Sequence, residues 1–232
     1  VSGGTAGNLS SLIAARYRWR SRAQGRHDRT RGLVISSKGA HSSVKQAVLA
    51  MDADVIQVPA DERGRLTRQA LRATINGLDA VDRDRVFAIV ATSGTTNLGV
   101  IDDLAAVADS CTDINEWGTW FHVDGAYGGA ALCAPSVRHM FDGIERADSF
   151  IVDPHKWFFG PYDSCALVYR NIHDGRRAHT QHAEYLDVLH GDTDDTAPWN
   201  EMNPADVAHH LTRRARGLPM WFSLATHGTD AY

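Results

Sequence analysis

Two side chains able to take part in covalent and acid–base chemistry each follow a short apolar segment of the sequence. Lys156 lies in the run Ser149–Trp157, and Asp124 precedes it in the run His122–Tyr127. An amine can hold the aldehyde of pyridoxal 5'-phosphate, and a carboxylate can keep the ring nitrogen of that cofactor protonated, so that the ring withdraws electrons. The pair therefore predicts a pyridoxal phosphate site with Lys156 as the anchor and Asp124 at the ring nitrogen.

The neighbours of both residues bear on this interpretation. An acid at the end of an apolar strand is costly to bury unless a cation compensates it, and a protonated pyridine is such a cation. A loop-capping carboxylate is the commoner reading of Asp124 taken alone, but the small residues within 125–129 leave room for a flat ring. The aromatic residues Trp157–Phe159 predict a partly buried, apolar setting for Lys156, in which a neutral amine could attack an aldehyde.

Three further segments carry candidate cofactor contacts. Gly3-Gly4-Thr5 before a predicted helix can present backbone N–H groups and a hydroxyl to a phosphate, or can be only a tight turn. A dinucleotide loop is not predicted, because the Gly-x-Gly-x-x-Gly spacing is absent. His155 could donate to a phosphate, and Asp153 could orient His155. His41 could stack on a pyridine ring, although a loop histidine is more often solvated.

The elements that would position these residues alternate between strand and helix. Helices are predicted over 5–20, over 44–51 with Ser42 or Ser43 as the cap, over 67–76, and from Asp102 or Asp103 to 111. Strands are predicted over 33–35, 55–58, 86–91, 119–123, 150–152 and 165–169. This order implies an α/β fold with a mainly parallel sheet and helices on both faces. Thr92, Asp124 and Lys156 follow strand ends, where such sheets bind ligands.

The sequence predicts three regions. A cofactor-binding large domain covers 1–190, a polar mobile loop covers 191–203, and a helical segment covers 204–232, in which Pro219 should kink or restart the helix. The chain begins at Val1, without a methionine, before a glycine turn that would normally follow a strand. It stops directly after a helical pattern. We therefore expect an internal fragment of a longer protein.

Composition limits the other classes of function. The 232 residues, 43% of them hydrophobic, suffice for one sizeable core, and the net charge of −4 argues against nucleic-acid binding. The three cysteines are widely spaced, so neither a disulfide framework nor a zinc site is predicted, and no metal is expected. No apolar stretch approaches the roughly 20 residues needed to cross a bilayer. A cytoplasmic protein without a membrane or nucleic-acid partner is expected.

Five motifs occur together, in an order and at a spacing that are specific as a set. They are Ser2–Leu9, Ala40–Ser43, Ala91–Thr96, His122–Tyr127 and Asp153–Trp157. With these motifs the sequence resembles the group II pyridoxal-phosphate-dependent amino-acid decarboxylases, which have the large domain of fold type I. The resemblance runs nearly end to end, and implies that an N-terminal segment and a small C-terminal domain lie outside this sequence.

The resemblance implies a role for each candidate. Lys156 would anchor the cofactor, Asp124 would pair with the ring nitrogen, and His41 would stack on the ring and face the substrate carboxylate. The other implied cofactor contacts are Ala126 on the opposite ring face, Gly4, Thr5 and His155 at the phosphate, and Thr92 near Asp124. Asp153 stands where several relatives carry asparagine, and two anions would repel each other if it approached the phosphate.

The implied reaction is loss of CO2 from an L-amino acid to give the amine, with an aromatic substrate favoured, in a homodimer. Relatives protonate the product carbon with a loop tyrosine, but Leu186–His210 contains none, and Val207 or a near neighbour takes the approximate place. Oxidative deamination to an aldehyde is therefore an alternative. An aminotransferase of the same fold and a non-catalytic cofactor-binding module are two others.

Overall fold

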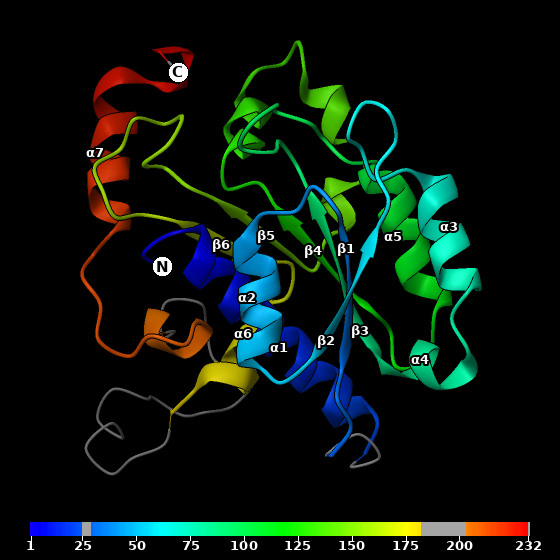
Figure 1. Ribbon diagram of the computed structural model, residues 1–232. Helices are drawn as coiled ribbons and strands as arrows, with labels where there is room; N and C mark the ends of the chain where they lie inside the picture. Colours follow the sequence, from blue (N-terminus) through cyan, green and yellow to red (C-terminus); the bar gives the residue numbers. More distant parts are fainter. Residues whose placement is uncertain (25–28, 182–202, 232) are drawn as a thin grey trace.

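A six-stranded sheet forms the centre of the computed structural model, which describes residues 1–24, 29–181 and 203–231 (Figure 1). The strand order is β2-β1-β3-β4-β5-β6, and all neighbours pair in parallel except β5 and β6. The predicted α/β class with a mainly parallel sheet is confirmed. The strands are β1 Leu33–Ser37, β2 Asp54–Val58, β3 Val86–Thr92, β4 Trp120–Asp124, β5 Ser149–Val152 and β6 Ala166–Tyr169.

Helices cover both faces of this sheet (Figure 1). Helices α1 and α2 pack on one face, with α6 against α1, whereas α3 and α5 pack on the other face. The α-helices are α1 Gly4–Arg22, α2 Ser42–Ala50, α3 Arg68–Asn76, α4 Ala80–Arg85, α5 Leu104–Asp113, α6 Ile172–His179 and α7 Gly217–His227. Short 3-10 turns are formed by Gly128–Cys133, Arg138–Phe141, Ile144–Arg146, Pro204–Val207 and Thr229–Ala231.

The central strand β3 shows why the sheet is buried on both sides. All seven of its residues are buried, as expected for a parallel strand between two helical layers. Side chains alternate along a strand, so Ile89 packs in the cluster with α3 and α5, while Val90 packs in the cluster with α1 and α2. The two apolar layers hold the strand ends in place, and with them the residues that follow each strand.

The structure corrects one predicted helix cap and decides between the two candidates for another. His41, and not Ser42 or Ser43, is the N-cap of α2, since its side chain accepts a hydrogen bond from the Ser43 backbone N–H. Asp103 caps α5, but Asp102 instead accepts from the backbone N–H groups of Leu66 and Thr92 at 2.7 and 2.8 Å. Burial raises the pKa of Asp102 to about 6. This carboxyl therefore ties the end of β3 to the loop before α3.

The C-terminal part departs further from expectation. Helix α6 was not predicted, and the periodicity between Val207 and Phe222 is not one helix, since a 3-10 turn ends at Val207 and α7 begins at Gly217. Pro219 lies in the first turn of α7, where it restarts the helix. The polar stretch Gly191–Pro198, expected to be mobile, lies outside the described residues.

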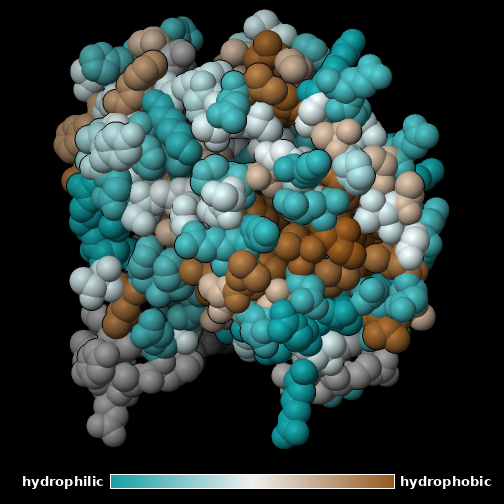
Figure 2. Space-filling view, in the orientation of Figure 1, coloured by the Kyte–Doolittle hydropathy of each residue, from teal (hydrophilic) through white to brown (hydrophobic). Residues whose placement is uncertain are grey.

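The face seen in Figure 2 is mostly polar but carries a band of hydrophobic surface near the sheet edge formed by β2. Val55 and Ile56 of this edge strand are half-buried. Within residues 1–24, 29–181 and 203–231, no helix combines the length and the apolar character needed to span a bilayer.

Gly94, in the loop after β3, lies against the backbone of Gly128. Its φ is +100°, and an added Cβ would lie 2.5 Å from the Gly128 Cα. We expect Gly94→Ala to lower the free energy of unfolding by about 3 kcal/mol or more. The backbones of Gly94 and Gly128 lie in segments that follow the central strands β3 and β4, so neither can move away without disturbing the ends of these strands. The matched control is Gly99→Ala, since Gly99 also has a positive φ, +64°, but nothing lies within 4 Å of the added Cβ. Its cost should be about 1 kcal/mol, and equal losses in urea unfolding would refute the contact argument.

His179 ties α6 to α1, because its Nε2 lies 2.9 Å from the Ser10 carbonyl oxygen and the side chain is buried. Burial lowers the pKa of His179 to about 4, below the ordinary value of 6.5. The stability that depends on the neutral ring is thus present above pH 6.5 and is lost as the pH falls toward 4. His179→Gln should remove up to about 3 kcal/mol of this acid dependence in urea unfolding. The exposed His227→Gln should leave the dependence unchanged, and identical profiles for wild type and His179→Gln would contradict the assignment.

Candidate active site

One cavity of about 790 Å³ lies beyond the C-terminal ends of the central strands. It is lined by the turn before α1, the loops after β1, β3 and β4, and the turn after β5. All nine residues predicted for the site line it: Gly4, Thr5, His41, Thr92, Asp124, Ala126, Asp153, His155 and Lys156. The parallel register explains the convergence, since Thr92 of β3 pairs directly with Asp124 of β4.

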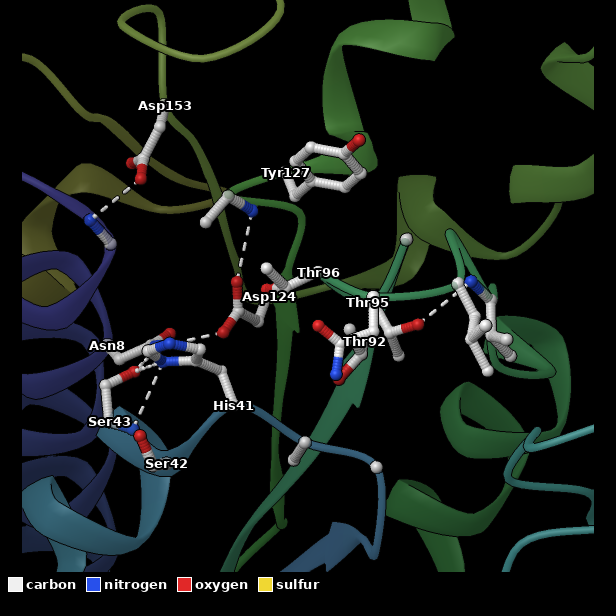
Figure 3. A pocket seen from close by; sticks show the side chains of 18 of the residues that line it. Asn8, His41, Ser42, Ser43, Thr92, Thr95, Thr96, Asp124, Tyr127 and Asp153 are labelled. Atoms are coloured by element: carbon white, nitrogen blue, oxygen red, sulfur yellow. Dashed lines mark hydrogen bonds between the residues drawn. The ribbon is translucent and has the colours of Figure 1, made fainter.

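Asp124 is 4% exposed and faces the cavity from the end of β4 (Figure 3). One carboxylate oxygen accepts from the Ala126 backbone N–H at 3.1 Å, and the other accepts from Asn8 Nδ2 at 2.9 Å. The first bond is a loop-capping contact, which the sequence alone had offered as the commoner interpretation of Asp124. The second joins the carboxylate to α1 on the cavity side, so Asp124 combines a local capping role with a place in the site.

Asp153, in the turn after β5, has three nitrogen atoms near one oxygen of its carboxylate, two from the same turn and one from the start of α1. Lys156 Nζ lies 2.9 Å from Asp153 Oδ2, the Gly4 backbone N–H donates to the same oxygen at 3.2 Å, and His155 Nε2 lies 3.6 Å from it. The other oxygen, Oδ1, is buried without a hydrogen-bond partner in the described part of the chain. The Asp153 carboxylate is therefore stabilised by the backbone at the start of α1 and by the Lys156 amine, with the His155 ring close by.

The setting of Lys156 differs from the prediction. Of its three aromatic neighbours, Phe158 is buried, but Trp157 and Phe159 are 41% and 80% exposed. Phe159 has a positive φ of 50°, and the turn directs it away from the core. The expected partial burial of Lys156 is confirmed, since its side chain is 33% exposed, but the expected apolar setting is wrong among the described residues, because the amine contacts the Asp153 carboxylate.

His155 has a defined orientation. The Ser164 backbone N–H donates to His155 Nδ1 at 3.0 Å, so in the neutral ring the proton is carried by Nε2, which faces Asp153. The ring also stacks on Tyr162, with 4.6 Å between centroids. A fixed N–H donor toward the start of α1 is what a phosphate contact would require.

Several functional neighbours were not predicted. Asn8 and His122 are buried beside Asp124, and Ser43 and Ser149 bond to them. Asn8 lies four residues after Gly4 on α1, which places both on the same helix face, and this spacing could have indicated Asn8. His122 had no such signal, because it is inside an apolar strand.

The cavity fits pyridoxal phosphate on three structural grounds. A Cβ at Gly4 would lie 2.9 Å from the Ala126 Cβ, so only glycine lets the start of α1 pack against the loop after β4 at the cavity wall. The buried Thr92 hydroxyl has no partner among the described residues and lines the same space. An amine and a carboxylate, Lys156 and Asp124, line the same cavity, which also contains the donors near Asp153.

A mainly parallel α/β sheet that brings these groups around one cavity defines a cofactor-binding protein of the pyridoxal class. The family model described as the pyridoxal-dependent decarboxylase conserved domain matches residues 1–232. The chain belongs to the pyridoxal-dependent decarboxylase family, which confirms the resemblance inferred from the five motifs.

The similar curated proteins include decarboxylases with two kinds of name. The aromatic-L-amino-acid decarboxylase of Bacillus atrophaeus is 32% identical over 235 residues, covering 100% of this chain and 46% of the relative. The cysteine sulfinic acid decarboxylase of Homo sapiens is 36% identical, covering 79% of this chain and 38% of the relative.

Solved structures similar to this chain include proteins with the PLP cofactor. Oryza sativa TDC with PLP and tryptamine superposes with a TM-score of 0.85 at 27% identity, covering 99% of this chain and 46% of that one. Mouse CSAD superposes with a TM-score of 0.79 at 30% identity, covering 99% and 47%. The chain thus spans less than half the length of these relatives.

Proposed function

We propose that the protein removes the carboxyl group of an L-amino acid as CO2, with this chain supplying the pyridoxal phosphate site. The observation that carries the proposal is the meeting of Lys156 and Asp124 on one cavity at the strand ends, in a chain of this family. When bound, the cofactor supplies an electron-withdrawing ring that stabilises the negative charge left by the departing carboxylate.

Each residue receives a role from its position. Lys156 anchors the cofactor covalently, Asp124 keeps the ring nitrogen protonated, and His41 lies over the ring toward the substrate carboxylate. The remaining proposed contacts are Ala126 on the opposite ring face, Gly4, Thr5 and His155 at the phosphate, and Thr92 beside Asp124. All of these side chains or backbone groups line the same cavity.

Asp153 receives a different role from that of a phosphate ligand. Its carboxylate already accepts from the Gly4 N–H and pairs with Lys156. A second anion would compete for the same donors. We therefore assign Asp153 to holding Lys156 and His155 in place.

The substrate is proposed to be aromatic, because a relative aligned over the whole chain is an aromatic-L-amino-acid decarboxylase. A sulfinate or other acidic substrate is the second candidate. It is favoured by the exposed cation Lys38, which also lines the cavity, and by the cysteine sulfinic acid relatives. Release of labelled CO2 from carboxyl-labelled tryptophan, tyrosine and cysteine sulfinate separates the two. A kcat/KM for cysteine sulfinate above that for both aromatic acids would overturn the first candidate.

The fate of the product carbon needs its own assay, because the segment expected to carry a loop acid lies mostly outside the described residues. Decarboxylation gives one amine for each CO2 without oxygen uptake. Decarboxylation coupled to oxidative deamination instead consumes O2 and water, and gives the aldehyde, CO2, ammonia and hydrogen peroxide. An aminotransferase would give a keto acid and no CO2. A cofactor-binding module would bind the cofactor without any turnover. We expect the amine.

A homodimer and a cytoplasmic location complete the proposal. Large apolar side chains are exposed near the cavity, among them Leu98 at 80% and Tyr162 at 77%, and a second copy would cover them. Light scattering of the purified protein tests this, and a monomeric mass at micromolar concentration would contradict it. The described cysteines, Cys111, Cys133 and Cys165, are free thiols, in keeping with a reducing compartment.

A further inference from the structure

Asn8 is the branch point of a buried hydrogen-bond network beneath the cavity (Figure 3). Resting on the function proposed above, we propose that Asn8 is a positioning residue: its single amide fixes the Asp124 carboxylate and orients the Ser43 hydroxyl that contacts the His41 ring. Its side chain is 1% exposed, and three of its hydrogen-bonding positions are used.

The orientation of the Asn8 amide follows from its neighbours. Nδ2 lies 2.9 Å from Asp124 Oδ2 and 2.9 Å from the Ser43 hydroxyl. The flipped amide would set its carbonyl oxygen against a carboxylate, with two acceptors facing each other. Both amide hydrogens are therefore committed, one to Asp124 and the other to Ser43.

The carbonyl oxygen of the same amide defines the state of His122. Asn8 Oδ1 lies 2.8 Å from His122 Nε2, so that nitrogen must donate. The other ring nitrogen, Nδ1, lies 2.8 Å from the Ser149 hydroxyl and accepts from it in the neutral ring. Burial lowers the pKa of His122, although the charge of Asp124 opposes this effect. His122 is a neutral ring that holds the Asn8 amide against rotation.

Ser149 completes this arm. Its hydroxyl hydrogen is committed to His122, so the Ser11 hydroxyl at 2.6 Å and the Trp120 indole N–H at 2.8 Å both donate to its oxygen. Every bond from Trp120 through Ser149, His122 and Asn8 then runs in one direction and ends on Asp124. A chain of this kind strengthens its last bond, because each donor is polarised by the one before it.

The second arm reaches His41. The Ser43 backbone N–H donates to His41 Nδ1 at 3.2 Å, so this nitrogen is an acceptor. The Ser43 hydroxyl, 2.8 Å away, then donates to the same nitrogen, while its oxygen accepts from Asn8. The neutral His41 ring therefore carries its proton on Nε2. The Asn8 amide thus fixes the carboxylate proposed for the ring nitrogen. It also orients the Ser43 hydroxyl, which together with the Ser43 backbone N–H donates to the ring proposed to stack above the cofactor.

The test compares pyridoxal phosphate with its deaza analogue, in which carbon replaces the ring nitrogen. Wild type should bind the cofactor more tightly than the analogue, because only the cofactor offers a protonated nitrogen to Asp124. Asn8→Ala should reduce this preference about tenfold, since a hydrogen bond to a charged group is lost. A merely structural role for Asn8 would weaken both ligands equally, and an unchanged preference would overturn the inference.

Two matched serine variants serve as controls. Ser43→Ala leaves the Asn8–Asp124 bond in place and should keep the preference. Ser10→Ala, on the same helix but bonded to Ala6 and His209, should keep both the preference and the His41 tautomer. Should Asn8→Ala not fold, Asn8→Ser gives the same comparison with one hydroxyl donor retained. Its preference should fall by less than tenfold, and no change would again overturn the inference.

The His41 arm has an independent readout in the cofactor-free protein. Nitrogen NMR of the imidazole should show one tautomer, protonated at Nε2, in wild type. Because the Ser43 backbone N–H still donates to His41 Nδ1, Asn8→Ala should keep this tautomer. A tautomer mixture in Asn8→Ala would show that the substitution disturbs the whole site and not the Asp124 carboxylate alone, and would overturn the inference. Failure of wild type to bind pyridoxal phosphate at all would contradict the proposed function, and this inference with it.

Discussion

Lys156→Ala should abolish covalent attachment of the cofactor and lower kcat/KM by on the order of a thousandfold or more. The amine is the group that bonds to the cofactor aldehyde, and among the three lysines of the chain, Lys38, Lys45 and Lys156, it is the one paired with Asp153 beside the start of α1. Absorbance spectra of the cofactor-loaded protein and labelled-CO2 assays measure the two effects.

The control for this substitution is Lys45→Ala. Lys45 is exposed on α2 and does not line the cavity, so its loss should change neither spectrum nor rate. Lys156→Ala should still fold, because the side chain is one-third exposed and its removal leaves Asp153 bonded to the Gly4 N–H. Near-wild-type turnover by a folded Lys156→Ala protein would remove Lys156 from the mechanism.

Asp124→Asn should reduce kcat by about two to three orders of magnitude while leaving weakened cofactor binding. A neutral amide cannot hold a proton on the ring nitrogen, whereas the carboxylate can. One carboxylate oxygen caps the loop through the Ala126 N–H, and an amide oxygen can take over that bond. The fold should therefore survive, and the loss should appear in the rate at saturating cofactor.

Asp103→Asn provides the matched change at a carboxylate outside the cavity. Asp103 caps α5 through the Ala106 N–H, and asparagine caps nearly as well. The free energy of unfolding should therefore be nearly unchanged, and kcat should stay within about twofold of wild type. If Asp124→Asn resembles this control, the carboxylate is only a loop cap and the proposed role at the ring nitrogen is wrong.

The sheet and the convergence of the site could be predicted because their signals are local. An unbroken apolar run such as 86–92 is typical of a strand buried on both faces, and parallel strands place their C-terminal residues at one edge. Thr92, Asp124 and Lys156 could thus be placed together without knowledge of any contact. The short helix α4 could not be predicted, because none of its residues is buried and its sequence shows no helical periodicity of apolar residues.

The fine structure of the site could not be predicted because it depends on contacts distant in sequence. Asn8 and His122 are 114 positions apart and meet only when α1 packs on the sheet. The exposure of Phe159 depends on a turn with positive φ, which its aromatic side chain does not favour. His41 was predicted to precede a serine cap, but its own ring takes the capping position.

The most direct test of the central claim is borohydride reduction of the cofactor-loaded protein, followed by peptide mapping. Reduction makes permanent any bond between the cofactor aldehyde and a lysine amine, and the three lysines of this chain lie in separate peptides. The account predicts that the label is found on Lys156 and not on Lys38 or Lys45. A folded, cofactor-exposed protein that carries its label elsewhere, or carries none, would contradict it.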